Sequence, residues 1–196
     1  MYSIGIAGPT CSGKTSVCIN IARKLGDAEY LSSDDFLVEK CEYPTFKGFL
    51  NMDSPVGIKF DDLFLTMENL KKGIKVEVPV YDKKLSKAVG KRTANPRSFL
   101  LTEGFLLFHD ERIRKLIDLK FFLDLPFNVQ ENRRLKRKIH YDKSYFNDVV
   151  IPMYETYVKP TAKYADFIID ADRPIEYVSK EMEEIIRKCS KQVLKC

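Results

Sequence analysis

Short apolar runs alternate with longer amphipathic stretches along the chain, and this alternation predicts an α/β fold with a mostly parallel sheet. The expected strands are residues 2–7, 28–32, 98–103, 120–125 and 167–170. Apolar residues three or four positions apart predict helices at 13–25, 56–72, 112–117, 128–140, 147–158 and 174–194. The stretches 34–54 and 75–96 show no regular period, and we expect them to be substrate-facing loops.

The composition indicates one compact domain that spans residues 1–196. Of the 196 residues 44% are hydrophobic, which is enough for a sizeable core. No apolar run reaches the roughly 18 residues of a membrane-spanning helix, and the start MYSIGIAGPT lacks the features of a signal peptide. Five cysteines without a C-x-x-C pair favour a reducing compartment over a disulfide framework or a zinc site. We therefore expect a cytoplasmic protein with no membrane partner.

One segment matches G-x-x-x-x-G-K-[ST], the phosphate loop (P-loop) that follows a strand and opens a helix. Its residues are Gly8, Pro9, Thr10, Cys11, Ser12, Gly13, Lys14 and Thr15. Successive backbone N–H groups of such a loop form a nest for anions, and the helix dipole adds to it. We expect Lys14 to reach the β- and γ-phosphates and Thr15 to ligate Mg²⁺. The segment predicts a site for a nucleoside triphosphate.

Carboxylates at two expected strand ends favour a metabolite kinase. The chain lacks the N-K-x-D motif of regulatory GTPases, and its length leaves little room for the machinery of an ATPase motor. A kinase needs a carboxylate that takes the proton of the acceptor hydroxyl. Asp34 and Asp35 follow the strand 28–32, at the sheet edge where the P-loop lies, so either is a candidate, although an aspartate there also suits a turn. Glu103 ends the strand 98–103 and is a candidate for the Mg²⁺ site.

A basic run in the expected helix 128–140 predicts a short lid at about 133–147. The basic residues are Arg133, Arg134, Lys136, Arg137 and Lys138. Arg133 and Arg137 share a helix face and could clamp phosphoryl oxygens. A solvated charged face is one alternative, and a nucleic-acid patch with Tyr141, Tyr145 and Phe146 is another. The net charge of +5 and the lack of an RNA-binding module argue against nucleic acid as a partner.

Taken together, these motifs resemble the uridine kinase-like branch of P-loop kinases, with features of nicotinamide riboside kinases. The resemblance rests on the P-loop and on the segments SSDDF (32–36), NMDSP (51–55), PVYD (79–82), EGF (103–105), YVKP (157–160) and KYAD (163–166). It implies an α/β P-loop fold, with a central parallel sheet, helices on both faces and a short basic lid. It also implies transfer of the γ-phosphoryl group of ATP, with Mg²⁺, to the 5′-hydroxyl of a ribonucleoside in nucleoside salvage.

The P-loop motif, the basic run, the aromatic residues and the resemblance together give each candidate residue a role. Asp34 becomes the base, and Lys14, Arg133 and Arg137 complete the catalytic set. Thr15, Asp34 and Glu103 become the metal site. Asp53 would hold the ribose hydroxyls, Tyr81 and Asp82 would line the nucleoside site, and Tyr141 could stack on the base.

The nucleoside base is the least determined part of this interpretation. Uridine kinases carry a histidine after P-V-Y-D, whereas this chain has KKLSK at 83–87, and the segments 48–50 and 152–154 look closer to nicotinamide riboside kinases. Lys83, Lys84 and Lys87 would repel a cationic ring if any of them points inward. We therefore favour uridine or cytidine, with nicotinamide riboside, another small metabolite, or a regulator without turnover as alternatives. Donor preference and a homo-oligomer are left open.

Overall fold

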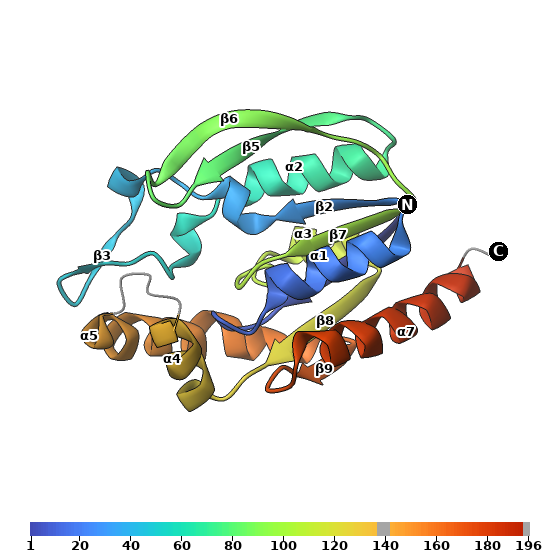
Figure 1. The fold of residues 1–196 in the computed structure, drawn as a ribbon. Coiled ribbons are helices and arrows are strands. Elements are labelled where there is room, and N and C mark those ends of the chain that lie inside the picture. Colours follow the sequence, from blue (N-terminus) through green and yellow to red (C-terminus); the bar gives the residue numbers. More distant parts are fainter. Residues whose placement is uncertain (137–141, 194–196) are drawn as a thin grey trace.

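The computed structural model describes residues 1–136 and 142–193, and its centre is a five-stranded parallel sheet (Figure 1). The strands are β1 (Tyr2–Ala7), β2 (Ala28–Ser32), β7 (Phe99–Glu103), β8 (Leu119–Asp124) and β9 (Phe167–Asp170). Their order across the sheet is β2-β7-β1-β8-β9, and every neighbouring pair is parallel. The five predicted strands are confirmed, three of them with the expected bounds. All six residues of β1 are buried, as expected for a central strand covered on both faces.

Alternation along the strands sends apolar side chains into two separate cores. One face of the sheet packs against α1 (Lys14–Leu25) and α7 (Ile175–Val193). The other face packs against α2 (Phe60–Lys71), α3 (Glu111–Leu116) and the segment around Tyr154 and Val158. The predicted helices on both faces of the sheet are thereby confirmed, and α2 starts four residues later than expected because Pro55–Gly57 form a separate 3₁₀ turn.

The segment after α4 (Phe127–Lys136) contains the most irregular helix in the described part of the chain. It comprises α5 (Lys143–Tyr145) and α6 (Ile151–Met153), which alternate with wide π-type turns at Phe146–Val150 and Tyr154–Val158, and it ends in a 3₁₀ turn, Lys159–Tyr164. Single-turn π segments often occur at functional sites. The lid predicted at 133–147 includes residues 137–141, which lie outside the described residues.

The expectation of loops at 75–96 and 34–54 is wrong in part. Residues 75–96 contain a long antiparallel hairpin, β5 (Val76–Asp82) and β6 (Lys87–Ala94), and residues 34–54 contain the short pair β3 (Thr45–Phe46) and β4 (Phe49–Leu50). Most of β6 is exposed, so its sequence carries no apolar period. In Figure 1 the hairpin arches over α2 at the top of the view.

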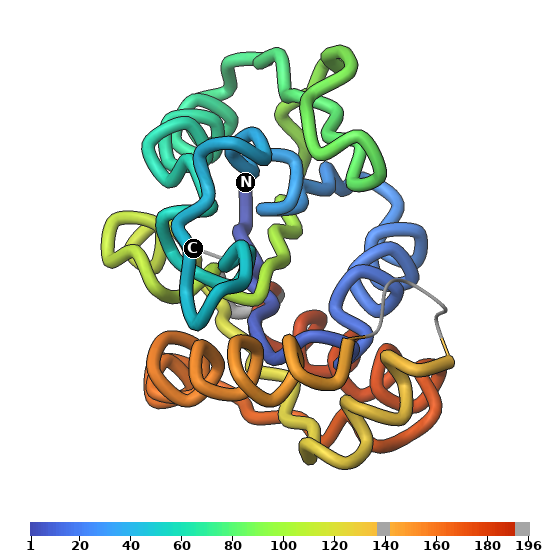
Figure 2. The backbone as a smooth tube through the Cα atoms, turned by 90° about the vertical axis from the view of Figure 1, so that its left-hand side faces the viewer, coloured from blue at the N-terminus to red at the C-terminus, as the bar shows by residue number. Residues whose placement is uncertain are grey.

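The carboxyl ends of the parallel strands meet at one edge of the sheet, which Figure 2 shows face on. The loops that follow β1, β2 and β7 lie at this edge, and the segment 34–58 extends over it. In a sheet of this kind ligands bind beyond the carboxyl ends of the strands. None of the helices in the described ranges combines the length and the apolar composition of a membrane span.

Candidate active site

The P-loop has a backbone that only glycine tolerates at its first position. Gly8 has a φ of +143°, and a Cβ atom placed there would lie 2.4 Å from the carbonyl oxygen of Leu123 in β8. Gly13, with a φ of +90°, caps the start of α1. The loop is therefore pressed against the sheet while its N–H groups and the start of α1 remain available to anions. The buried Ser12 hydroxyl has no hydrogen-bond partner among the described residues, as expected of a loop built to meet a ligand.

Lys14 extends along the inside of this loop. Its buried ammonium group donates hydrogen bonds to the carbonyl oxygens of Gly8, at 2.9 Å, and Pro9, at 2.7 Å. Its positive charge also acts on Glu103, where it opposes a rise in pKa. Lys14 thus lies between the P-loop and the carboxylate at the end of β7.

Glu103 gathers three hydroxyl groups around one carboxylate oxygen. Its Oε1 accepts hydrogen bonds from Ser32 (2.8 Å), Tyr30 (3.0 Å) and Thr15 (3.1 Å). The parallel register places Ser32 directly beside Glu103. The Glu103 side chain is only 2% exposed, and burial, followed by the nearby charge of Asp34, raises its pKa.

Gly104 explains why a glycine follows this glutamate. A Cβ atom at position 104 would lie 2.0 Å from the hydroxyl oxygen of Ser33, so the strand end can approach the segment after β2 only without a side chain. This close approach brings Glu103 next to Asp34. The E-G dipeptide is therefore a packing requirement of the site.

The oxygen atoms of Thr15 and Glu103 fit Mg²⁺, which prefers hard oxygen ligands. Within the described ranges, no group of three or more His, Cys, Asp and Glu side chains could hold a metal ion. A site with one hydroxyl and one carboxylate is nevertheless typical of Mg²⁺ that arrives with a nucleotide, since phosphates and water supply the other ligands.

Asp34 and Asp35 are separated by their environments. Asp34 Oδ2 lies 2.5 Å from the ammonium nitrogen of Lys83, and the charge of Asp34 raises the pKa of both Glu103 and Asp53. Asp34 therefore lies near both of those carboxyl groups. Asp35 instead accepts a hydrogen bond from the backbone of Tyr81, and burial raises its pKa. The two aspartates thus differ in their contacts, and Asp34 has the ion pair with Lys83.

Asp53 is a further carboxyl group near Asp34, whose charge raises its pKa. Its Oδ2 accepts a 2.7 Å hydrogen bond from the hydroxyl of Tyr145. Burial raises the pKa of Asp53, while the bond from Tyr145 and the charge of Arg134 oppose the rise. The Arg134 guanidinium also lies 5.9 Å from the centre of the Tyr145 ring. Arg134 was missed as a site residue, because its sequence position does not show that it, rather than Arg133, faces Asp53.

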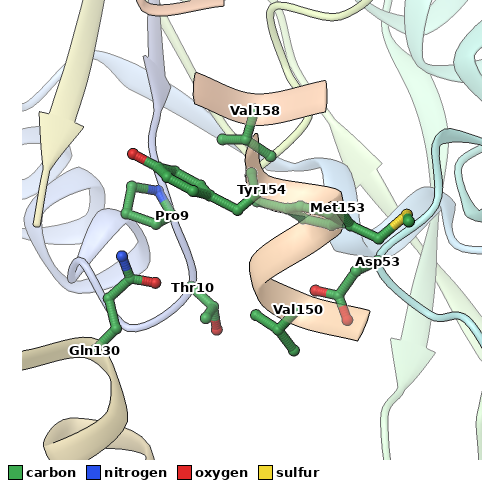
Figure 3. Close-up of a pocket in the computed structure, with 9 residues that line it drawn as sticks. Pro9, Thr10, Asp53, Gln130, Val150, Met153, Tyr154 and Val158 are labelled. Atoms are coloured by element: carbon green, nitrogen blue, oxygen red, sulfur yellow. The ribbon is translucent and has the colours of Figure 1, made fainter. Parts of the chain in front are cut away.

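A pocket connects the P-loop with Asp53 (Figure 3). It is lined by Pro9, Thr10, Asp53, Phe105, Gln130, Val150, Met153, Tyr154 and Val158. Gln130 and Asp53 lie on opposite sides of Thr10 in this view. Its walls are mostly apolar, and Thr10, Asp53 and Gln130 contribute the polar groups.

The chain matches the model of the Phosphoribulokinase / Uridine kinase family over residues 3–175. It belongs to this family. Among its relatives, Uridine kinase-like protein 3 of Arabidopsis thaliana is 36% identical over 181 residues, which cover 86% of this chain and 39% of the relative. A probable uridine-cytidine kinase of Caenorhabditis elegans is 32% identical over 212 residues, which cover 94% and 84%. The chain spans about two fifths of the length of the first of these relatives.

Solved structures of the same fold include other small-molecule kinases. A possible uridine kinase from Bacillus stearothermophilus aligns with a TM-score of 0.67 at 20% identity, covering 86% of this chain and 88% of that one. The phosphoribulokinase from Rhodobacter spheroides aligns with a TM-score of 0.64 at 15% identity, covering 89% and 73%. At these identities the likeness supports the fold alone.

Other residues that the sequence analysis singled out contact the protein backbone. The Arg133 guanidinium donates to the carbonyl oxygens of Cys11 (3.3 Å) and Ala171 (2.9 Å). The Tyr81 hydroxyl donates to the carbonyl oxygen of Val38 (2.9 Å), and Asp82 Oδ1 accepts from two N–H groups of the hairpin turn. Arg133 thus braces the P-loop, whereas Tyr81 and Asp82 shape the β5–β6 hairpin. Arg137 and Tyr141 lie outside the described residues.

Proposed function

We propose that this protein transfers the γ-phosphoryl group of ATP, with Mg²⁺, to the 5′-hydroxyl of a ribonucleoside, namely uridine or cytidine. The observation that carries the proposal is the contact of Thr15 with Glu103, beside both Lys14 and Asp34. Phosphate-binding, metal-binding and proton-accepting groups are thereby gathered at one point. The uridine kinase relatives support the choice of nucleoside.

In this proposal the residues of the P-loop edge prepare the donor. Lys14 exchanges its bonds to the loop carbonyls for bonds to phosphate oxygens, and the loop N–H groups bind the remaining oxygens. Thr15 and Glu103 hold the Mg²⁺, which when bound neutralises charge on the phosphates. Most of the catalysis in phosphoryl transfer comes from such positioning and charge stabilisation.

The residues on the other side of the site prepare the acceptor. Asp34 accepts the proton of the 5′-hydroxyl, so that the oxygen can attack the γ-phosphorus while the bond to the β-phosphate oxygen breaks. Asp53 accepts hydrogen bonds from the 2′- and 3′-hydroxyls, and Tyr145 orients its carboxylate. One ribose carries both the 5′-hydroxyl that Asp34 would deprotonate and the diol that Asp53 would bind. A free 5′-hydroxyl and a free diol are therefore both required of the acceptor.

A panel of nucleosides tests the proposal. Each is incubated with ATP and Mg²⁺, and the product is identified by its mass. We expect uridine and cytidine monophosphate as the main products. Ribonucleosides should be favoured over deoxyribonucleosides by at least about tenfold, because a missing hydroxyl removes one hydrogen bond to the Asp53 carboxylate. The variant Lys14→Ala serves as the control without turnover.

Three results would each overturn a different part of the proposal. Nicotinamide mononucleotide as the main product from an equal mixture would replace uridine with nicotinamide riboside and leave the kinase intact. Binding of ATP without turnover of any nucleoside would favour a nucleotide-binding regulator. Near-normal turnover by Lys14→Ala would contradict the phosphate-binding role of the loop.

A further inference from the structure

The turn of the β5–β6 hairpin brings a lysine into the site. Lys83 lies in this turn, and its ammonium nitrogen is 2.5 Å from Asp34 Oδ2. The sequence places Lys83, Lys84 and Lys87 after the PVYD segment without showing which of them points inward, and the contact with Asp34 singles out Lys83. The contact joins residues 49 positions apart, and its acceptor, Asp34, is the carboxylate that the proposed reaction uses for proton transfer.

The backbone that carries Lys83 is held in place from both sides. Within the turn, Asp82 Oδ1 accepts hydrogen bonds from the N–H groups of Lys84 (2.8 Å) and Leu85 (3.1 Å). Just before the turn, the Tyr81 hydroxyl bonds to the carbonyl oxygen of Val38. These hydrogen bonds hold the backbone of the turn, so the position of Lys83 beside Asp34 does not depend on the conformation of its long side chain alone.

The far end of the hairpin is fixed to the central sheet. Arg92 in β6 donates to Glu29 Oε1 at 2.8 Å and to the carbonyl oxygen of Tyr30 at 2.5 Å, both in β2. Because β2 leads directly to Asp34, the hairpin and the base are parts of one connected unit. Lys83 and Asp34 are thus held in a fixed relation by elements that are far apart in the sequence.

The charge of Lys83 matters because the site is crowded with carboxylates. Asp34 raises the pKa of both Asp53 and Glu103, which shows that the three groups influence one another. Lys14 and Arg134 offset Glu103 and Asp53, respectively, and Lys83 offsets Asp34. Removing the Lys83 charge would leave the acceptor side more negative by one unit and would make it more favourable to a cation.

We propose that Lys83 is a specificity-determining residue that selects acceptor nucleosides with a neutral ring against those with a cationic ring. The proposal rests on the function proposed above, because it concerns the acceptor of the same reaction. A ribose whose 5′-hydroxyl is bound by Asp34 would bring its ring near the Lys83 ammonium, which contacts the same carboxylate. Like charges several ångströms apart, discounted because the Lys83 side chain is 68% exposed, change relative affinity by roughly three- to tenfold.

Two ribosides of nearly the same shape isolate the effect of charge. Nicotinamide riboside has a cationic ring, whereas its dihydro form has a neutral ring on the same ribose. Each is measured as a competitor of uridine phosphorylation, and the ratio of the two inhibition constants is compared between the wild type and Lys83→Met. We expect the wild type to bind the neutral riboside more tightly, and the variant to shift the ratio toward the cation by roughly three- to tenfold.

Two further variants separate charge from shape. Lys84→Met removes the adjacent lysine charge of the same turn but keeps the backbone N–H that binds Asp82, so the ratio should stay at its wild-type value. Lys83→Arg keeps the charge and should also keep the ratio. Added salt should reduce the discrimination of the wild type and have little effect on Lys83→Met.

The outcomes are distinguishable from those of the proposed function. An unchanged ratio in Lys83→Met, an equal shift in Lys84→Met, or a wild type that does not discriminate because neither riboside competes would overturn the role of Lys83 while uridine is still phosphorylated. If the wild type phosphorylates no nucleoside, the proposed function itself fails.

Discussion

Asp34 and Asp35 are neighbours in the chain, yet their carboxyl groups serve different parts of the molecule. Asp34 contacts Lys83 and influences Glu103 and Asp53, whereas Asp35 is held by the backbone of Tyr81. The two adjacent side chains have different surroundings because they belong to the 3₁₀ turn Ser33–Phe36. At the start of this turn, the Ser32 hydroxyl accepts a hydrogen bond from the Asp34 N–H (3.2 Å).

At the scale of this residue pair, Asp34→Asn should lower kcat by about 10²–10⁴-fold, since the amide cannot accept the hydroxyl proton. Affinity for ATP should change little, because the P-loop is intact. Asp35→Asn is the matched control and should have the smaller effect on kcat. Steady-state kinetics with saturating ATP–Mg²⁺ measure both, and the opposite order would reassign the base to Asp35.

The raised pKa of Asp53 predicts how nucleoside binding depends on pH. Burial favours the neutral form of this carboxyl, so it takes up a proton at a higher pH than an exposed aspartate does. Only the ionised form accepts hydrogen bonds from both ribose hydroxyls, and we therefore expect the KM for the nucleoside to rise as the pH falls, beginning at a higher pH than an exposed aspartate would give. In Asp53→Asn the KM should be high at every pH, with a flatter profile. A profile that Asp53→Asn leaves unchanged would assign the titration to another group.

At the scale of elements, the P-loop packs so closely against β8 that a methyl group added at Gly8 would strain the loop. Gly8→Ala should destabilise the protein by at least about 2–3 kcal/mol, since the Cβ atom would meet the Leu123 backbone and the φ of +143° disfavours any side chain. Gly73→Ala is the control, because its φ is also positive (+80°) but nothing lies within 4 Å of an added Cβ atom, so it carries the backbone cost without the clash. Urea unfolding measures both, and equal losses would refute the steric argument.

The sequence determines some elements more fully than others. The unit of β1, P-loop and α1 could be predicted because its glycines, lysine and apolar runs each meet a separate local requirement. The β5–β6 hairpin could not, since β6 faces solvent along most of its length and so shows no apolar alternation. Pro79 and Gly90 within its strands also weakened the signal, because both residues are unusual in strand interiors.

The candidate site likewise contains residues that the sequence predicts and residues that only the tertiary structure reveals. Glu103 was predictable as an acid at the end of a buried strand, whereas its partners Tyr30 and Ser32 depend on the register between β2 and β7. The partners of Arg134 and Lys83 were not predictable for a related reason, because each acts on a residue brought close only by tertiary packing. Local motifs therefore indicate the donor side, and long-range contacts define the acceptor side.

At the scale of the whole molecule, the acceptor side is assembled from segments that lie far apart in the chain. The Tyr145 hydroxyl donates to Asp53 and accepts from the N–H of Met52 at 3.1 Å, which ties the segment after β4 to the helix that begins at α5. The proposed nucleoside site thus depends on how the two segments are held together.

Loss of this link should weaken acceptor binding more than donor binding. We expect Tyr145→Phe to raise the KM for the nucleoside several-fold, to leave the KM for ATP nearly unchanged, and to lower stability by about 1 kcal/mol. Tyr177→Phe removes a hydroxyl from an exposed tyrosine and should change neither constant. Parallel changes in both KM values would mean that Tyr145 acts on the whole structure instead of on the acceptor side.

The direction of the strands also determines how this protein can be attached to other objects. β1 begins at Tyr2 and covers about 20 Å before it reaches the P-loop. α7 runs back to the same starting edge, where Arg187 bonds to the carbonyl oxygen of Lys24 near the end of α1. A tag, a surface or a fused protein joined to Met1 or beyond the end of α7 is therefore held at the edge of the sheet opposite the P-loop. The edge that carries the P-loop then faces the solution.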